Sequence, residues 1–209
     1  MSHARAERSA LCDLLDRLGP DAPTLCAGWT TYDLAAHLVL RERRLDAAGG
    51  IALRPLAGYT ASVQRGLKEK HSYAELVAMA RRPGGPYGLL PFLDEQVNTL
   101  EYFVHHEDVR RAQEPWEPRA LPESLERALA WRLRAAARLT LRRSPVPVVL
   151  RGPGGATLKA GPSDGPAVEV AGRPGELVLF CFGRQRHAEV ELTGAPDAVE
   201  RLANASLGV

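Results

Sequence analysis

Apolar residues recur at helical spacing along the first two thirds of the chain. A stripe of leucines predicts a first helix over Ala4–Leu18, which a Gly-Pro pair then ends. Thr30 and Asp33 have the spacing of a capping box, in which the hydroxyl and the carboxylate each satisfy a free N–H group. They predict the start of a second helix that runs to the glycines at Gly49.

The same capping-box spacing at Ser72 and Glu75 predicts a short helix that ends near residue 82. A third long helix is expected from Pro91 to about Ala112, since proline is well tolerated at a first helical position. Another long helix begins around Pro122. Four long helices joined by loops indicate an antiparallel bundle, and the core of such a bundle can hold a metal ion between facing helices. The apolar stripe expected to face the core of the third helix consists of Leu93, Val97, Leu100 and Val104.

The hydrophobic pattern changes near residue 144, where short β-rich runs separated by Gly and Pro begin. The last of these runs is followed by one closing helix. The expected fold class is therefore α+β, with a helical bundle over residues 1–144 and a small α+β domain over 145–209. The five expected strands lie at about 146–152, 156–161, 167–172, 176–183 and 188–194.

Composition narrows the class of protein. The 209 residues carry a formal charge of +2, and 45% of them are hydrophobic, as in an ordinary soluble domain. No apolar run reaches the ~20 residues of a membrane span, and the first residues have no apolar segment that predicts a secretory leader. Basic residues are interspersed with acidic ones, which argues against a nucleic-acid partner.

Three widely spaced cysteines, Cys12, Cys26 and Cys181, favour neither a disulfide framework nor a zinc finger. We expect a cytoplasmic protein with no membrane partner.

One group of polar residues stands out on the third long helix. Glu101, His105 and Asp108 are spaced i, i+4 and i+7 and so project from one helix face. A carboxylate and an imidazole one turn apart are well spaced to bind one divalent ion. His37 follows Leu34 by three residues on the apolar side of the second helix, which makes it the best candidate for a third ligand.

Two other interpretations of these residues stay open. A single histidine on an apolar face is commonly a hydrogen-bonded core residue, and Glu101–His105 has the spacing of a simple ion pair. Burying all three groups without a shared partner would be costly, however, and this favours a metal site.

The segments LCAGWTTYDLAAHL (25–38) and NTLEYFVHHEDVRRA (98–112) resemble the mycothiol-dependent maleylpyruvate isomerase family, whose N-terminal domain is a DinB-like metal-binding four-helix bundle. ELVLFCFGR (176–184) resembles that family's small C-terminal domain. The resemblance implies a divalent metal, with zinc favoured over nickel or iron, held by His37, Glu101 and His105 with coordination positions left open. It implies that Asp108 orients a ligand imidazole. It also raises mycothiol as a co-substrate.

An open metal position can bind a small thiol and stabilise its thiolate, which then attacks an electrophile in an isomerisation or a transfer. The alternative is a metal-binding or stress-response module without catalysis. Arg184 is the candidate catalytic residue outside the metal site, since its guanidinium can bind an anionic substrate group bidentately. Cys26 lies close to the second helix, and its role is left open. The expected partners are a small-molecule thiol and an electrophile, and the expected state is a monomer or a homodimer.

Overall fold

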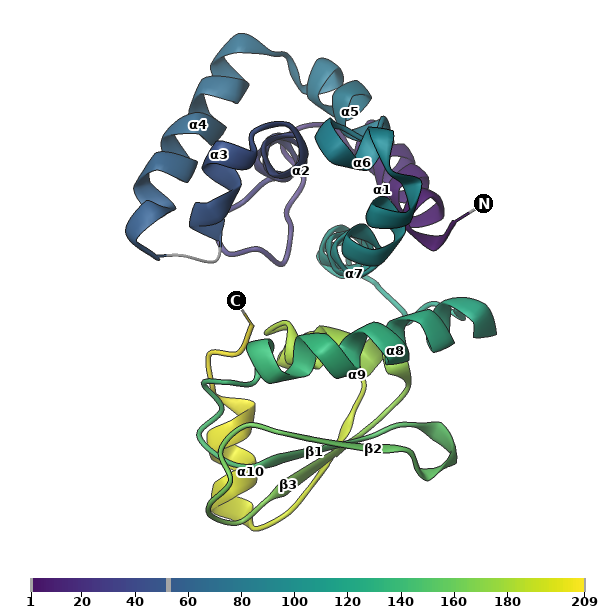
Figure 1. Ribbon diagram of the computed structural model, residues 1–209, viewed down its shortest axis with the longest axis vertical. Coiled ribbons are helices and arrows are strands. Elements are labelled where there is room, and N and C mark those ends of the chain that lie inside the picture. The colour runs from purple at the N-terminus through teal and green to yellow at the C-terminus, as the bar shows by residue number, and fades with distance from the viewer. Residues whose placement is uncertain (1, 52–53, 209) are drawn as a thin grey trace. The chain divides into compact units, whose positions relative to one another are not determined.

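The computed structural model describes residues 2–51 and 54–208. The chain divides into two compact units, residues 1–117 and 118–209. This division differs from the boundary expected at residue 144, because the long helix after Pro122 packs against elements of the second unit. The α+β class is confirmed, with helices in the first unit and a small mixed sheet with helices in the second (Figure 1).

The first unit is helical throughout its described secondary structure, apart from one isolated bridge between Pro23 and Thr30. Its fourth long helix is α4, over residues for which the sequence pattern predicted no helix. The apolar pattern of α4 is weak, since the helix buries few side chains and Thr60 is the one buried residue described in it. The helices are α1 (His3–Leu18), α2 (Thr31–Arg43), α3 (Leu45–Ala48), α4 (Ala57–Lys70), α5 (Tyr73–Arg81), α6 (Gly85–Leu89) and α7 (Pro91–Arg110).

The capping boxes begin their helices as expected. Thr30 and Asp33 form both reciprocal hydrogen bonds at the start of α2, and Ser72 and Glu75 do the same at the start of α5. The second helix ends at Arg43, earlier than expected, and the short α3 follows it.

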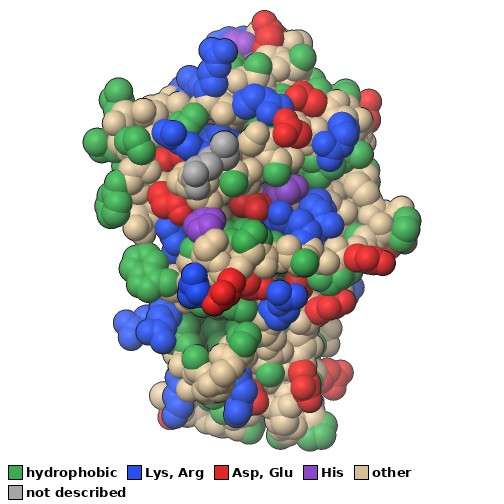
Figure 2. All heavy atoms as spheres, turned by 90° about the vertical axis from the view of Figure 1, so that its right-hand side faces the viewer, with side chains coloured by type: hydrophobic (Ala, Val, Ile, Leu, Met, Phe, Trp, Pro, Cys, Tyr) green, Lys and Arg blue, Asp and Glu red, His purple; other side chains and the backbone are tan. Residues whose placement is uncertain are grey.

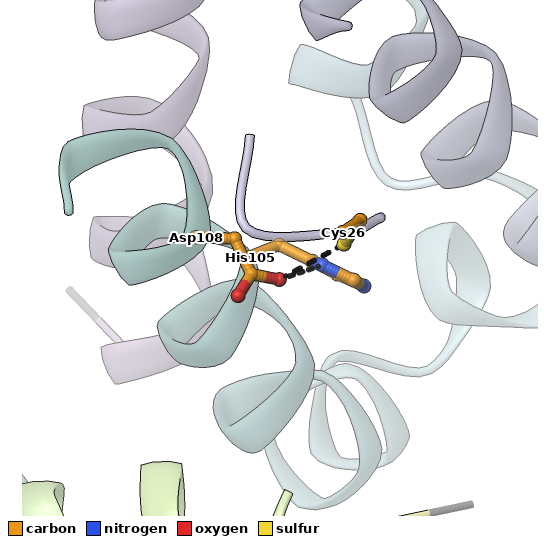
Figure 3. A group of neighbouring side chains, drawn as sticks. All are labelled: Cys26, His105 and Asp108. Atoms are coloured by element: carbon orange, nitrogen blue, oxygen red, sulfur yellow. Dashed lines mark hydrogen bonds and ion pairs between the residues drawn. The ribbon is translucent and has the colours of Figure 1, made fainter. Parts of the chain in front are cut away.

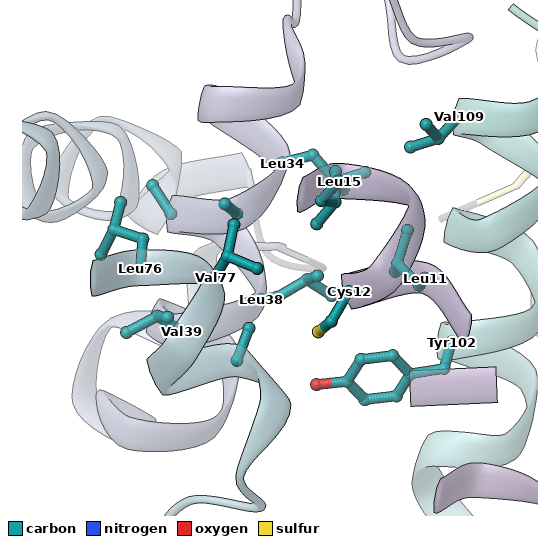
Figure 4. Packing of buried hydrophobic residues seen from close by; sticks show 13 residues of the cluster. Leu11, Cys12, Leu15, Leu34, Leu38, Val39, Leu76, Val77, Tyr102 and Val109 are labelled. Carbon is teal, nitrogen blue, oxygen red and sulfur yellow. The ribbon is translucent and has the colours of Figure 1, made fainter. Parts of the chain in front are cut away.

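The core of the first unit lies between α1, α2, α5 and α7 (Figure 4). Leucine side chains from α1 and α2 meet Leu76 and Val77 of α5, and Tyr102 and Val109 close the cluster from α7. Burial of these side chains removes apolar surface from water, which is the main favourable contribution to folding. The core therefore fixes how α2 and α7, the two helices of the candidate site, are placed within the unit.

The buried face of α7 is polar. The expected apolar stripe of this helix is wrong in part, because Val97 is 37% exposed whereas Val104 is buried. The fully buried residues on the first half of the helix are instead Asp94, Asn98 and Thr99. Such groups are buried only where they have hydrogen-bond partners, so this face of α7 holds polar networks as well as apolar contacts.

The second unit contains a four-stranded sheet with the order β2-β1-β3-β4. The central pair, β1 and β3, is parallel, and both outer pairs are antiparallel. The strands are β1 (Val148–Arg151), β2 (Thr157–Ala160), β3 (Val168–Ala171) and β4 (Glu191–Thr193), and the helices are α8 (Glu123–Thr140), α9 (Pro174–Cys181) and α10 (Pro196–Ala203).

The strand expected at 176–183 is wrong, because this apolar run forms helix α9. A short run buried on all sides has no alternation that distinguishes a strand from a helix. Pro174 at the first helical position and Glu176 in the first turn both favour a helix start. Gly183, with φ of 86°, follows the helix end in the left-handed conformation that glycine adopts readily.

Across the described residues, none of the helices has the length and apolar character that crossing a membrane requires. On the face shown in Figure 2, basic and acidic side chains are intermixed and do not gather into one basic stripe.

Candidate metal centre

Four side chains bridge α2 and α7. His37 and Arg41 are one turn apart on α2, and Glu101 and His105 are one turn apart on α7. His37 contacts His105, and Arg41 pairs with Glu101, so α2 and α7 run antiparallel at this contact. His105 is thus the neighbour of both His37 and Glu101, the other two predicted ligands.

Two distances at this site are close to those around a tetrahedral ion, although the ligand atoms of His37, Glu101 and His105 do not all lie within 4.8 Å of one another. The ring centroids of His37 and His105 lie 5.2 Å apart, and two imidazoles on one tetrahedral zinc have centroids about 5 Å apart. The Nε2 atom of His105 lies 3.7 Å from Oε2 of Glu101, against about 3.3 Å between two ligand atoms on such an ion. Two imidazoles and a carboxylate are also a donor set that zinc accepts.

His105 is fixed by a carboxylate on its own helix. Its Nδ1 atom lies 3.0 Å from Oδ2 of Asp108, which is completely buried, and the second ring nitrogen points away from Asp108 (Figure 3). Burial would lower the pKa of His105, but the hydrogen bonds and charges of Asp108 and Cys26 outweigh it and raise the pKa to about 9. A carboxylate on Nδ1 is the usual arrangement for a metal-binding histidine, because it orients the ring and presents Nε2.

Cys26 reaches this site from the loop before α2. The loop is tied to the end of α7, since the backbone N–H of Leu25 donates to the carbonyl oxygen of Asp108 at 3.0 Å. The Cys26 thiol then donates to Oδ2 of Asp108 at 3.3 Å. The ligand atoms of Cys26, His105 and Asp108 all lie within 4.8 Å of one another, so these residues form a second possible ligand set. Sequence spacing did not reveal it, because the loop contact joins distant parts of the chain.

The two ligand sets share His105 but use opposite ring nitrogens. Glu101 lies near Nε2, whereas Asp108, to which the Cys26 thiol donates, lies near Nδ1. One ring orientation therefore cannot serve both sets with a single ion. Hydrogen bonds account for the contacts on the Nδ1 side, whereas the Nε2 side faces Glu101.

Trp29 contributes to the site through packing. Its indole ring contacts the ring of His37 at 5.0 Å between centroids. On the same unit, Trp29 also lines a cavity of about 470 Å³ together with Tyr32, Gln64 and Lys68. Trp29 thus fixes one side of the His37 ring.

Arg184, the other predicted site residue, lies in the second unit just after α9. Its Nη1 atom donates to the carbonyl oxygen of Phe182 at 2.5 Å. It follows a helix and not the strand expected from the sequence. A role for Arg184 in binding an anionic group stays a prediction.

Fold and site together define a helical unit with a candidate metal centre of two histidines and a glutamate, followed in the chain by a small α+β unit. The family model for the mycothiol maleylpyruvate isomerase N-terminal domain matches residues 1–137. The chain belongs to this family.

Two solved structures share the fold. The mycothiol-dependent maleylpyruvate isomerase is 18% identical, with a TM-score of 0.53, and a histidine-to-alanine mutant of it is 16% identical, with a TM-score of 0.54. Each match covers 92% of this chain and 90% of the other. A comparison with curated protein sequences finds no match.

Proposed function

We propose that the chain binds one divalent ion through His37, Glu101 and His105 and uses it to activate a small thiol of the mycothiol type. Zinc is the preferred ion, with nickel and iron as alternatives for the same donors. The observation that supports this best is the 5.2 Å ring spacing of His37 and His105 beside a carboxylate 3.7 Å from Nε2. The family match names mycothiol and so supports the choice of thiol.

Asp108 and Trp29 support the two histidine ligands in this proposal. Asp108 accepts a hydrogen bond from Nδ1 of His105 and so keeps Nε2 as the ligand atom. Trp29 packs on the ring of His37. A zinc ion held here favours the deprotonated sulfur of an incoming thiol.

The reacting sulfur comes from outside the chain. Cys12 and Cys181 are completely buried, and burial raises the pKa of each thiol to about 12, so neither is a nucleophile at neutral pH. The Cys26 thiol is hydrogen-bonded to Asp108. A small-molecule thiolate that adds to a conjugated double bond and then leaves would isomerise the bond, and one that displaces a leaving group would be transferred. Arg184 is proposed to bind an anionic group of the electrophile.

The test has a metal arm and a thiol arm. Purified protein should hold about one zinc ion per chain after dialysis, and His105→Ala should lose it while His71→Ala, outside the site, retains it. Zinc-loaded protein with mycothiol and a panel of unsaturated keto acids should then isomerise the acid or consume the thiol. A full equivalent of zinc in His105→Ala overturns the ligand set. Metal binding without thiol binding or turnover overturns the proposed activity.

A second candidate function has its own observation. If Cys26 ligates the ion together with His105 and Asp108, the protein is a metal-binding module without a thiol substrate. Protection of the Cys26 thiol from alkylation by bound zinc would favour this candidate.

A further inference from the structure

We propose that Arg41 is a positioning residue of the metal centre, because it holds the carboxylate of Glu101 and connects it to a buried network of charged side chains. This inference rests on the proposed function, since it takes Glu101 as a metal ligand. Arg41 does not itself contact the ion or the substrate in this proposal.

The guanidinium of Arg41 has partners in two directions. Nη1 donates to Oδ1 of Asn98 at 2.5 Å, and Nε lies 3.4 Å from Oε2 of Glu101. The side chain of Arg41 is 11% exposed, whereas that of Glu101 is 30% exposed. Glu101 therefore has room to turn toward water, and its ion pair with the planar guanidinium of Arg41 opposes that turn.

Asn98 is itself held in one orientation. Its amide nitrogen donates to Oε1 of Glu42 at 3.1 Å and to Oδ1 of Asp94 at 2.7 Å. Because both amide hydrogens point at carboxylates, the amide oxygen must face Arg41. The position of Arg41 is thus set by a residue that cannot flip without losing two hydrogen bonds.

The two carboxylates behind Asn98 are fixed by Arg8. This guanidinium binds Glu42 through both terminal nitrogens, at 3.0 and 2.7 Å, and binds Asp94 at 2.7 Å. Each of these three side chains is at most 3% exposed. The network therefore extends from α1 through α2 and α7 to Glu101 and is anchored in the core.

The positive charge of Arg41 makes the direction of the change in metal affinity informative. A guanidinium close to a divalent cation repels it, so if Arg41 acted only through its charge, removing it would tighten metal binding. If Arg41 positions Glu101, removing it frees the carboxylate and weakens binding. Changes in groups that orient a ligand typically lower metal affinity about 10- to 100-fold. The direction of the change therefore distinguishes the two roles.

The experiment measures zinc affinity by chelator competition in the full chain. The variants are Arg41→Ala, Arg41→Lys, Glu101→Gln and the Arg41→Ala/Glu101→Gln double variant. Arg44→Ala is the matched control, because Arg44 lies just beyond the same helix and pairs with exposed Asp46. Arg41→Lys retains the positive charge but lacks the planar group that reaches both Asn98 and Glu101. Weaker zinc binding in this variant is therefore due to lost positioning of Glu101. The absorption spectrum of bound cobalt(II) reports the ligand geometry independently of activity.

We expect Arg41→Ala and Arg41→Lys to weaken zinc binding about 10-fold or more and to change the cobalt spectrum, whereas Arg44→Ala does neither. In the Glu101→Gln background, Arg41→Ala should have little further effect, since the two residues act through one contact. Unchanged or tighter binding in both Arg41 variants, or equal losses in the two backgrounds, overturns the inference. If Glu101→Gln itself leaves zinc affinity unchanged, the proposed ligand set fails instead.

Discussion

The imidazole rings of His37 and His105 lie 5.2 Å apart between centroids and meet nearly edge to face, at 74°. They come from helices far apart in the sequence, and no local rule of chain geometry requires them to meet. Asp108 holds the far nitrogen of His105, so Nε2 faces Glu101. This arrangement is the basis of the proposed metal centre.

Asp108 should control metal affinity without being a ligand. Asp108→Asn leaves the shape of the side chain almost unchanged but removes the charge that orients His105. We expect zinc affinity to fall about 10- to 100-fold, measured by chelator competition, with the stoichiometry still close to one. Asp46→Asn, at an exposed carboxylate, is the control and should bind zinc as the wild type does.

The metal-free protein should lose stability as pH rises above neutrality. The pKa of His105 is about 9 in the folded state and near 6.5 in an unfolded chain, so the folded state binds the proton more tightly. The stabilisation is complete below pH 6.5 and is lost as pH rises through 9.

The measurement is urea unfolding in EDTA of wild type and His105→Asn, because the difference between them isolates this group. The advantage of the wild type should shrink steadily from pH 6 to pH 9.5. A difference that stays constant over this range would contradict the proposed charge interaction of His105 with Asp108.

The three cysteines should differ in reactivity. Cys12 and Cys181 are completely buried and their pKa values are raised to about 12, whereas Cys26 is partly exposed. A thiol reagent should label Cys26 first in native protein and all three residues after denaturation, as mass spectrometry of peptides can show. Bound zinc should not reduce the labelling of Cys26 if the metal lies on the Nε2 side of His105. Strong protection by zinc would instead identify Cys26 as a ligand.

The buried network around Arg8 should contribute strongly to stability. Arg8→Met leaves Glu42 and Asp94 buried without their cation, and loss of one partner of a buried pair typically costs about 3–5 kcal/mol. Arg81→Met is the matched control, because Arg81 pairs with Asp13 and Asp16 at a more exposed position and should cost at most about 1 kcal/mol. Denaturant unfolding measures the loss in free energy of unfolding for each variant. Equal losses in the two variants would contradict the larger contribution predicted for the buried network.

Local patterns in the sequence predicted those features that depend on nearby residues. The capping boxes at Thr30 and Ser72 are set by contacts three residues apart, and the structure contains both. The shared helix face of Glu101 and His105 follows from their one-turn spacing, and the structure shows the contact between them.

Features that depend on tertiary contacts were missed or misjudged. The helix α4 buries too few apolar residues to produce a clear period, and α9 is buried on all sides, so its run gave no alternation. The contact of Cys26 with Asp108 depends on a loop tied back to α7, which no spacing reveals. The contact of Arg41 with Glu101 likewise depends on how α2 and α7 are placed by the core.

X-ray absorption spectroscopy of the zinc-loaded protein, without added thiol, tests the central claim most directly. The proposed site predicts a first shell of nitrogen and oxygen at about 2.0–2.1 Å, together with the outer-shell scattering of two imidazoles. It also predicts loss of one imidazole in His37→Ala. A spectrum unchanged in His37→Ala would contradict the site between His37, Glu101 and His105, and a sulfur scatterer at about 2.3 Å would show that Cys26 holds the ion instead.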